Sequence, residues 1–160
     1  MEKSSFEEIL KRDGKLCYSF RGVSMLPMLR QDRDLVVIQP TGGQCLAPLD
    51  VALYKRGEQY VLHRVISLKE GGYIFRGDNT YSPEYVPEDQ VLGVLSSFVR
   101  NGREYAVTDP RYLRYARFWC AVYGLRFILF RCRRLVSRLV RHLARRLLRR
   151  EDNDLKRGKT

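Results

Sequence analysis

The chain has 160 residues, the usual size of one compact domain with a small appendage. Hydrophobic residues make up 44% and aromatic residues 11% of the sequence, which suits a buried core and excludes a disordered chain. The formal net charge of +12 indicates an anionic partner.

The positive charge is confined to one segment. Residues 1–110 hold 14 Lys and Arg against 15 Asp and Glu, whereas residues 111–150 hold 13 Arg and no acidic residue. We therefore expect a near-neutral globular domain at 4–109, a basic extension at 111–150 and a polar tail at 151–160. This distribution argues against binding of nucleic acid through the whole surface.

The first part of the chain predicts one short helix followed by strands. Residues 4–12 form the helix, because serines can cap its start, Glu7 and Glu8 lie in its first turn, and Gly14 ends it. Asn101-Gly102 predicts a hairpin turn. Short apolar runs predict strands at 16–20, 35–38, 51–54, 60–66, 73–75, 91–99 and 105–107. Such strands predict a mainly β fold, either a coiled sheet or a small barrel.

The basic extension predicts a long amphipathic helix. Its apolar residues step by three or four and so share one face, with arginines opposite and a break near Gly124. We favour an anionic membrane surface as its partner, then an acidic protein, then nucleic acid, which needs no wide apolar face. The apolar residues are Phe118, Val122, Leu125, Leu129, Cys132, Val136, Leu139, Leu143 and Leu147.

The spacing of the cysteines and the first residues of the sequence indicate the cellular compartment. The four cysteines lie far apart without a Cys-x-x-Cys pair, so we expect free thiols, no metal site and no cofactor. The start is polar and acidic, and no uncharged apolar run approaches the ~20 residues of a spanning helix. The expected location is the cytoplasm, with a peripheral place on the inner face of the membrane.

Three short segments carry candidate chemistry. Residues 22–27 read Gly-Val-Ser-Met-Leu-Pro and place Ser24 on a constrained turn, as a nucleophile beside backbone N–H groups requires. His63 lies in a predicted strand and is suited to accept the serine proton near neutral pH. Asp78, in a Gly-Asp-Asn turn, is an acid that can orient the histidine.

The order and residue sequences of these segments resemble the motifs of the signal peptidase I superfamily, specifically those of its serine–histidine branch of the endoplasmic-reticulum and archaeal type. The matching pieces are Ser-Met-x-Pro at 24–27, His-Arg-Val at 63–65 and Gly-Asp-Asn at 77–79, and the likeness covers residues 22–95. The chain looks more like the short, anchor-free bacterial relatives than the membrane-anchored members. The resemblance implies a LexA/signal-peptidase-like coiled β-sheet core with a C-terminal helical extension, and cleavage of a leader or signal-like segment from a peptide or precursor protein.

The resemblance also implies roles for single residues. Ser24 would attack the scissile carbonyl, and His63 would accept its proton and pass it to the leaving amine. Asp78 is the first choice for orienting His63, and Glu84 is the rival, because eukaryotic relatives place a second acidic residue nearby. The oxyanion and substrate region would include the backbone N–H of Ser24 together with Gly22 and Met25.

One position motivates a second hypothesis. Many members of the superfamily carry, two residues before the nucleophile, a serine whose hydroxyl helps to hold the oxyanion. This chain has Gly22 at that position. The alternative function is therefore a catalytically weak or inactive relative that serves as a membrane-associated binding module.

Overall fold

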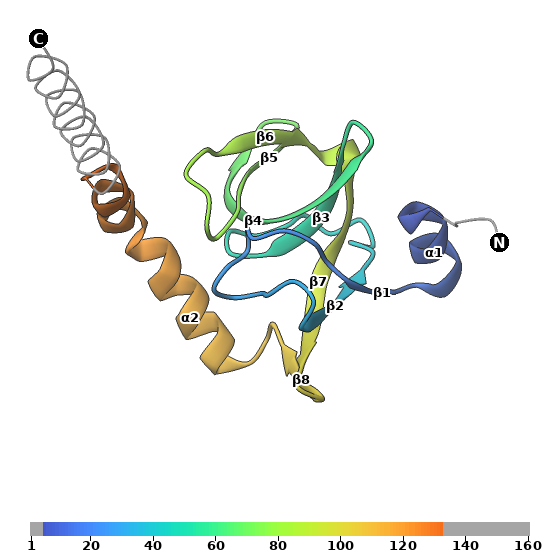
Figure 1. Ribbon diagram of the computed structural model, residues 1–160. Helices are drawn as coiled ribbons and strands as arrows, with labels where there is room; N and C mark the ends of the chain where they lie inside the picture. Colours follow the sequence, from blue (N-terminus) through green and yellow to red (C-terminus); the bar gives the residue numbers. More distant parts are fainter. Residues whose placement is uncertain (1–4, 133–160) are drawn as a thin grey trace, which may run out of the picture. The chain divides into compact units, whose positions relative to one another are not determined.

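The computed structural model describes residues 5–132. In this part of the chain eight strands form one antiparallel sheet with the order β1-β2-β7-β3-β4-β5-β6, and β8 pairs with β7. The sheet curls on itself, as Figure 1 shows, which confirms the mainly β prediction. The strands are β1 (Leu16–Ser19), β2 (Asp34–Gln39), β3 (Val51–Arg56), β4 (Gln59–Lys69), β5 (Gly72–Arg76), β6 (Glu84–Pro87), β7 (Val91–Arg100) and β8 (Arg103–Ala106).

The N-terminal helix α1 (Phe6–Asp13) has the predicted caps. Ser5 accepts a hydrogen bond from the backbone N–H of Glu8, whose side chain accepts one from the N–H of Ser5 in return. Gly14 takes the left-handed conformation after the last turn, with φ of 66°. The alternative cap, Ser4, lies outside the described residues. The 3-10 helix η1 (Glu88–Gln90) and the helix α2 (Pro110–Ala121) follow later in the chain.

Strand β6 is a strand that the sequence patterns missed. Its four residues, Glu-Tyr-Val-Pro, alternate only once and end in a proline, and the strand lies at the edge of the sheet beside β5. A proline is tolerated there because the N–H that it lacks has no ladder partner to satisfy on the outer side. Its first residue is Glu84, one of the candidate site residues.

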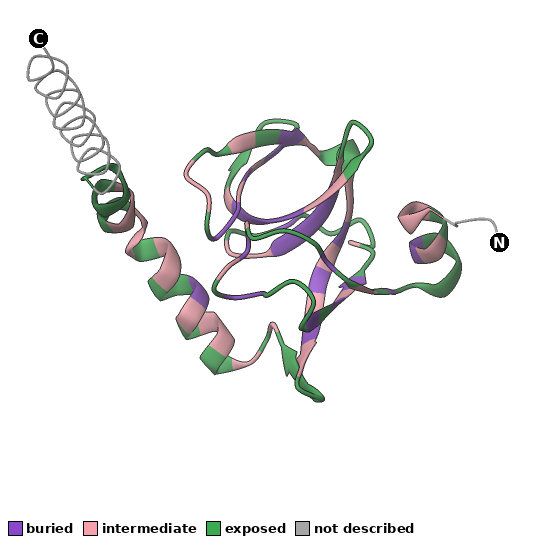
Figure 2. Ribbon diagram, viewed as in Figure 1, coloured by how far each residue is buried: buried purple, intermediate pink, exposed green. Residues whose placement is uncertain are grey.

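Strand β3 is buried on both faces (Figure 2), and this places the two halves of the core. Successive side chains of a strand point to opposite faces. Val51 and Leu53 pack into a cluster with α1, β1 and β2, whereas Ala52 and Tyr54 pack into a second cluster with β5 and β6. The curled sheet thus holds apolar side chains on both sides of its middle strand.

The same alternation separates two neighbouring polar residues on β4. His63 lies opposite Ala52 in the β3–β4 register, so it shares the face of Tyr54. Arg64 lies opposite Val51 and faces the other cluster. His63 and Arg64, which are consecutive on β4, therefore contact separate polar groups on the two faces of the sheet.

The basic extension begins as predicted with helix α2, and the chain divides into two compact units between Cys120 and Ala121. Residues 123–132 are again helical after a turn at Val122, close to the break expected near Gly124. The rest of the predicted helix, 133–150, and the tail, 151–160, lie outside the described residues. No helix within residues 5–132 has the length and apolar character needed to cross a membrane.

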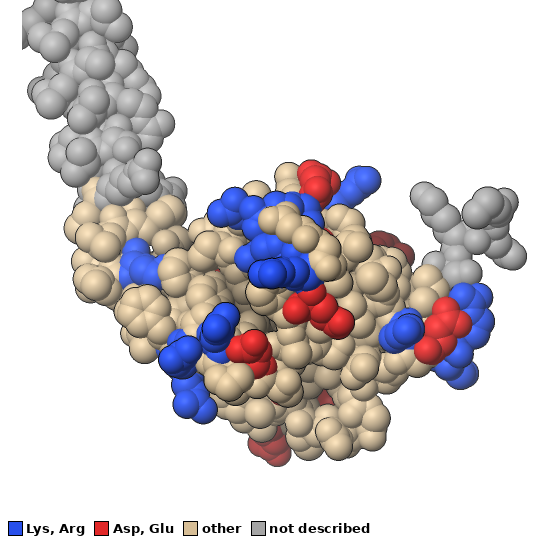
Figure 3. All heavy atoms as spheres, turned by 90° about the horizontal axis from the view of Figure 1, so that it is seen from below, with Lys and Arg blue, Asp and Glu red and all other residues tan. Residues whose placement is uncertain are grey.

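Acidic and basic side chains are intermixed on the face of the molecule in Figure 3, in small groups among uncharged atoms. This agrees with the near balance of charge in residues 1–110. The face shown carries no broad field of one sign. By residue count, the net positive charge of the sequence comes from residues 111–150.

Candidate active site

Ser24 lies in the turn that joins β1 to β2. The turn begins at Gly22, whose φ of 108° strongly favours glycine and whose N–H donates to Oε1 of Gln31 at 2.9 Å. Ser24 is half-buried, and the following Met25 is fully buried in the core. The Met25 side chain therefore anchors the turn rather than facing a substrate.

A second turn holds the serine turn in place. The backbone N–H of Asn79 donates to the carbonyl oxygen of Ser24 at 2.7 Å, and its side-chain amide donates to the carbonyl of Val23 at 3.2 Å. Gly77 allows this close approach. A methyl group on Gly77 would lie 2.7 Å from the Ser24 carbonyl oxygen and 3.0 Å from Nε2 of His63. The backbone carbonyl of Ser24 and Nε2 of His63 thus both lie close to Gly77.

The other ring nitrogen of His63 contacts Tyr54 and Glu84. Nδ1 lies 3.0 Å from the Tyr54 hydroxyl and 3.1 Å from Oε1 of Glu84. The Tyr54 hydroxyl also donates to Oε1 of Glu84, and Arg56 donates to its second oxygen at 3.1 Å. One carboxylate on β6 therefore joins a tyrosine and an arginine from β3 to the histidine on β4.

Burial and these contacts set the ionisation of the group. Burial lowers the pKa of His63 below its ordinary value, and the Glu84 carboxylate offsets part of this effect. Burial alone would raise the pKa of Glu84, but hydrogen bonds from Tyr54 and Arg56 and nearby positive charge outweigh it, so the pKa is lowered. Near neutral pH, Glu84 is an anion beside an uncharged imidazole.

Asp78, the first choice for orienting His63, binds Arg64 instead. Its carboxylate accepts two hydrogen bonds from the Arg64 guanidinium, at 2.8 and 2.7 Å, and a third from Tyr115 at 3.3 Å. Trp119 donates to the Asp78 backbone oxygen at 3.0 Å. The reason is the alternation along β4, which turns Arg64 towards Asp78 and His63 towards Glu84. The geometry thus favours the rival, Glu84, for the orienting role.

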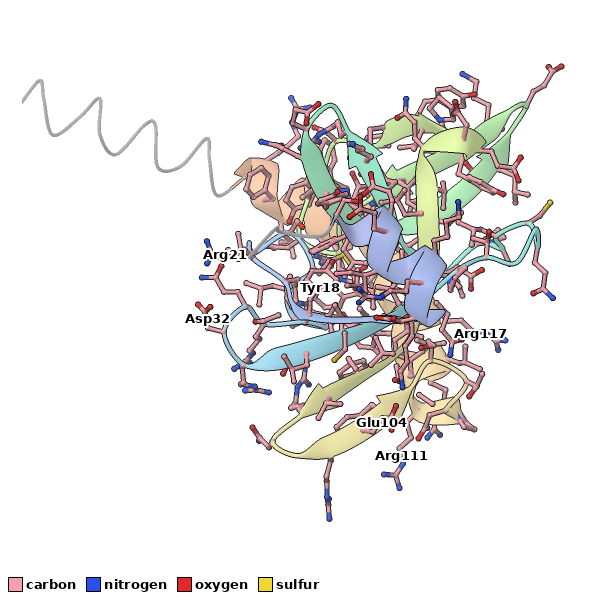
Figure 4. All side chains as sticks on the ribbon, turned by 90° about the vertical axis from the view of Figure 1, so that its right-hand side faces the viewer. Tyr18, Arg21, Asp32, Glu104, Arg111 and Arg117 are labelled. Atoms are coloured by element: carbon pink, nitrogen blue, oxygen red, sulfur yellow. The ribbon has the colours of Figure 1, made fainter. Side chains whose placement is uncertain are left out.

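Ser24 and His63 line one cavity of about 390 Å³. Its walls mix aromatic, aliphatic and polar side chains from β1, the loop after it, β3, β4 and the turn after β5, and Figure 4 labels Tyr18 and Arg21 among them. The remaining lining residues are Phe20, Arg56, Gln59, Tyr60, Val61, Leu62 and Thr80. The cavity gives both candidate reacting groups access to a ligand of several atoms.

Sequence reasoning missed two residues of this group, Tyr54 and Arg56. The parity of β3 relative to β4 is the signal that finds Tyr54, because diagonal neighbours on antiparallel strands share a face. Arg56 lies two residues after Tyr54 on β3 and shares its face, but its contact with Glu84 depends on β6, which the patterns did not predict. Within residues 5–132, no three His, Cys, Asp or Glu side chains gather in a way that could hold a metal ion.

Comparison with known proteins adds no further assignment. A scan against models of known protein families finds no match, and a search of curated proteins finds no similar sequence. Functional conclusions therefore rest on the residues themselves. What the geometry provides is a half-buried serine and a buried histidine at one cavity, with an anionic glutamate on the far nitrogen of the histidine.

Proposed function

We propose that the chain is a serine endopeptidase of the signal peptidase I-like type, with Ser24 as nucleophile and His63 as general base. One observation carries the proposal. His63 contacts the Glu84 carboxylate through Nδ1, while its Nε2 approaches Gly77 on the side of the Ser24 turn. A nucleophile, a base and an acid that orients the base are the three parts that serine hydrolysis needs.

The reaction requires only these groups and water. Ser24 Oγ forms a bond to the scissile carbonyl carbon as its proton passes to Nε2 of His63, and the backbone N–H of Ser24 donates to the oxyanion. The C–N bond then breaks and the amine takes the proton from Nε2. Water attacks the resulting ester, again with His63 as base, which releases the acid and restores Ser24.

The cavity supports a peptide as the substrate. Its size and its three aromatic lining residues suit a side chain of an extended segment, and both reacting groups line it. A leader or signal-like segment of a precursor protein is the substrate class that the resemblance favours. The cytoplasm, with a peripheral place at the inner membrane face, remains the proposed location.

A serine-directed acylating probe, read by intact-protein mass spectrometry, tests the proposal. We expect one adduct on the wild type and none on Ser24→Ala or His63→Ala. Ser67→Ala is the matched control, because Ser67 is an exposed serine on the same strand as His63, and it keeps the adduct. Labelling that survives Ser24→Ala, or a folded wild type that no probe labels, would contradict the proposed enzyme.

A second function, attachment to an anionic membrane, is favoured by one exposed apolar face. Leu125, Ile128 and Leu129 are each more than half exposed and share one side of a helical segment. They lie within the Arg-rich, acid-free segment 111–150. Such a helix inserts its apolar face between headgroups while its arginines bind the anionic lipid.

Vesicle sedimentation tests this attachment. We expect the chain to sediment with vesicles that contain phosphatidylserine and not with purely zwitterionic ones. Leu125→Glu combined with Leu129→Glu abolishes sedimentation, whereas Leu68→Glu, at an equally exposed leucine on β4, leaves it intact. Equal sedimentation of the double variant would refute the role of this face.

A further inference from the structure

Tyr54 is a fully buried side chain whose hydroxyl contacts both members of the histidine–glutamate pair. Its ring packs against Phe75 at a centroid distance of 4.7 Å, and the strand pairing holds it diagonally across from His63. A ring held in this way has no freedom to swing away. The hydroxyl is therefore fixed between the imidazole and the carboxylate.

The proton positions in this group follow from counting donors. Glu84 is ionised and accepts hydrogen bonds from Tyr54 and Arg56, so it has no proton to give. The single proton of the Tyr54 hydroxyl goes to Glu84. A contact between His63 Nδ1 and these two oxygens is then favourable only if Nδ1 carries the hydrogen. The lone pair of the neutral ring is left on Nε2, the atom near Gly77 and Ser24.

We propose that Tyr54 is a positioning residue whose hydroxyl donates to Glu84 and so keeps the proton of neutral His63 on Nδ1, and which lowers the basicity of Nε2 by sharing the charge of the carboxylate. Its importance for catalysis rests on the proposed function, whereas its effect on His63 does not. A hydrogen bond from Tyr54 competes with His63 for the same carboxylate oxygen. Without that bond, the carboxylate stabilises the imidazolium more strongly.

Other charges also face His63, and they stay in place when the hydroxyl is removed. Glu84 on β6 and Asp78 after β5 favour the charged imidazole, and Arg56 on β3 opposes it. Burial has the largest effect and lowers the pKa of His63. Tyr54→Phe keeps the ring, the burial and all three charges. A change in the titration of His63 in this variant therefore reports the hydroxyl alone.

The decisive experiment is a ¹⁵N NMR titration of the histidine ring nitrogens in the full chain. In the wild type we expect neutral His63 to carry its proton on Nδ1. We expect the pKa of His63 to rise in Tyr54→Phe, where the competing donor is gone. In Glu84→Gln we expect it to fall, since a favourable negative charge is lost. A role in packing alone would not move the two variants in opposite directions.

The matched control is Tyr73→Phe. Tyr73 is also buried, and its hydroxyl contacts Glu88 and the N–H of Leu46, away from His63. This variant loses a similar hydroxyl and leaves the His63 titration unchanged. Circular dichroism establishes that each variant is folded. If Tyr54→Phe does not fold, the wild-type tautomer and Glu84→Gln decide the matter, and a proton on Nε2 of wild-type His63 overturns the inference.

The rate of probe labelling against pH separates this inference from the proposed function. In Tyr54→Phe, we expect the acid limb of the profile to move to higher pH, with a loss of roughly threefold to tenfold below neutral pH. An unchanged His63 titration in Tyr54→Phe overturns the positioning role even if Ser24 is labelled. If no folded variant, including the wild type, is labelled while the titrations are as expected, the proposed peptidase activity is overturned. The effect of Tyr54 on His63 then still stands.

Discussion

Replacing Asp78 by Asn removes one charge from a fully buried ion pair. The side chain of Arg64 is 0% exposed and that of Asp78 is 2% exposed, so water cannot compensate for the lost carboxylate. Arg64 keeps only neutral partners, among them the Leu49 carbonyl at 2.8 Å and the Tyr112 hydroxyl at 3.2 Å. Breaking a buried pair by removing one partner costs about 3–5 kcal/mol. For a unit of this size we expect the melting temperature to fall by about 10–20 °C.

Thermal and urea unfolding, followed by circular dichroism, measure this loss. The Arg64→Met, Asp78→Leu double variant removes both charges, so it recovers most of the stability that Asp78→Asn loses. Asp13→Asn breaks an exposed ion pair with Arg12 and leaves the melting temperature unchanged within error. A loss of less than about 1 kcal/mol in Asp78→Asn would refute the reasoning, because it would mean that the guanidinium is solvated.

The same variant separates the roles of the two acids. Because the carboxylate near His63 belongs to Glu84, folded Asp78→Asn keeps most of its labelling by the acylating probe when assayed well below its melting temperature. Glu84→Gln shows the opposite pattern, with labelling lowered by roughly a hundredfold or more and a smaller loss of stability. If Asp78→Asn were the variant that lost labelling while folded, Asp78 would be the orienting acid.

Three further predictions follow from close contacts and burial. Gly77→Ala places a methyl group 2.7 Å from the Ser24 carbonyl oxygen, so we expect loss of probe labelling together with a lower melting temperature; unaltered labelling would contradict the contact. Burial lowers the pKa of His63 below its unfolded value, so the unfolded chain binds the proton more readily, and stability to urea falls as the pH drops below 6.5; His63→Gln weakens this dependence. Trp119→Phe loses the hydrogen bond to the Asp78 backbone and costs about 1 kcal/mol in urea unfolding.

The sequence predicted the strands well because apolar alternation and turn residues bound most of them. The sequence could not show which face of the sheet each candidate site residue occupies. Asp78 and Glu84 lie close together in the chain, and no local pattern shows which of them faces His63. That choice depends on His63 and Arg64 pointing to opposite sides of β4, and on Glu84 pairing with Phe75 in the β5–β6 ladder. Since β6 is a short edge strand with a weak pattern, the face of Glu84 could not be derived from the sequence.

The domain limit predicted at residue 109 follows the change of charge composition, although residues 112–125 are also expected to cap the β core in part. Charge composition changes there, but packing continues through the first turns of α2, where Tyr112, Tyr115 and Trp119 bind Arg64 and Asp78. The turn that contains Asp78 also binds the Ser24 carbonyl through the N–H of Asn79.

The first turns of the basic helix therefore belong to the structure that positions the candidate nucleophile, although their arginines resemble the rest of the extension. Charge composition reports which kind of partner a surface can bind, whereas the limit of a folded domain is set by its buried contacts. In this chain α2 carries both positive charge and contacts with the buried Arg64–Asp78 pair.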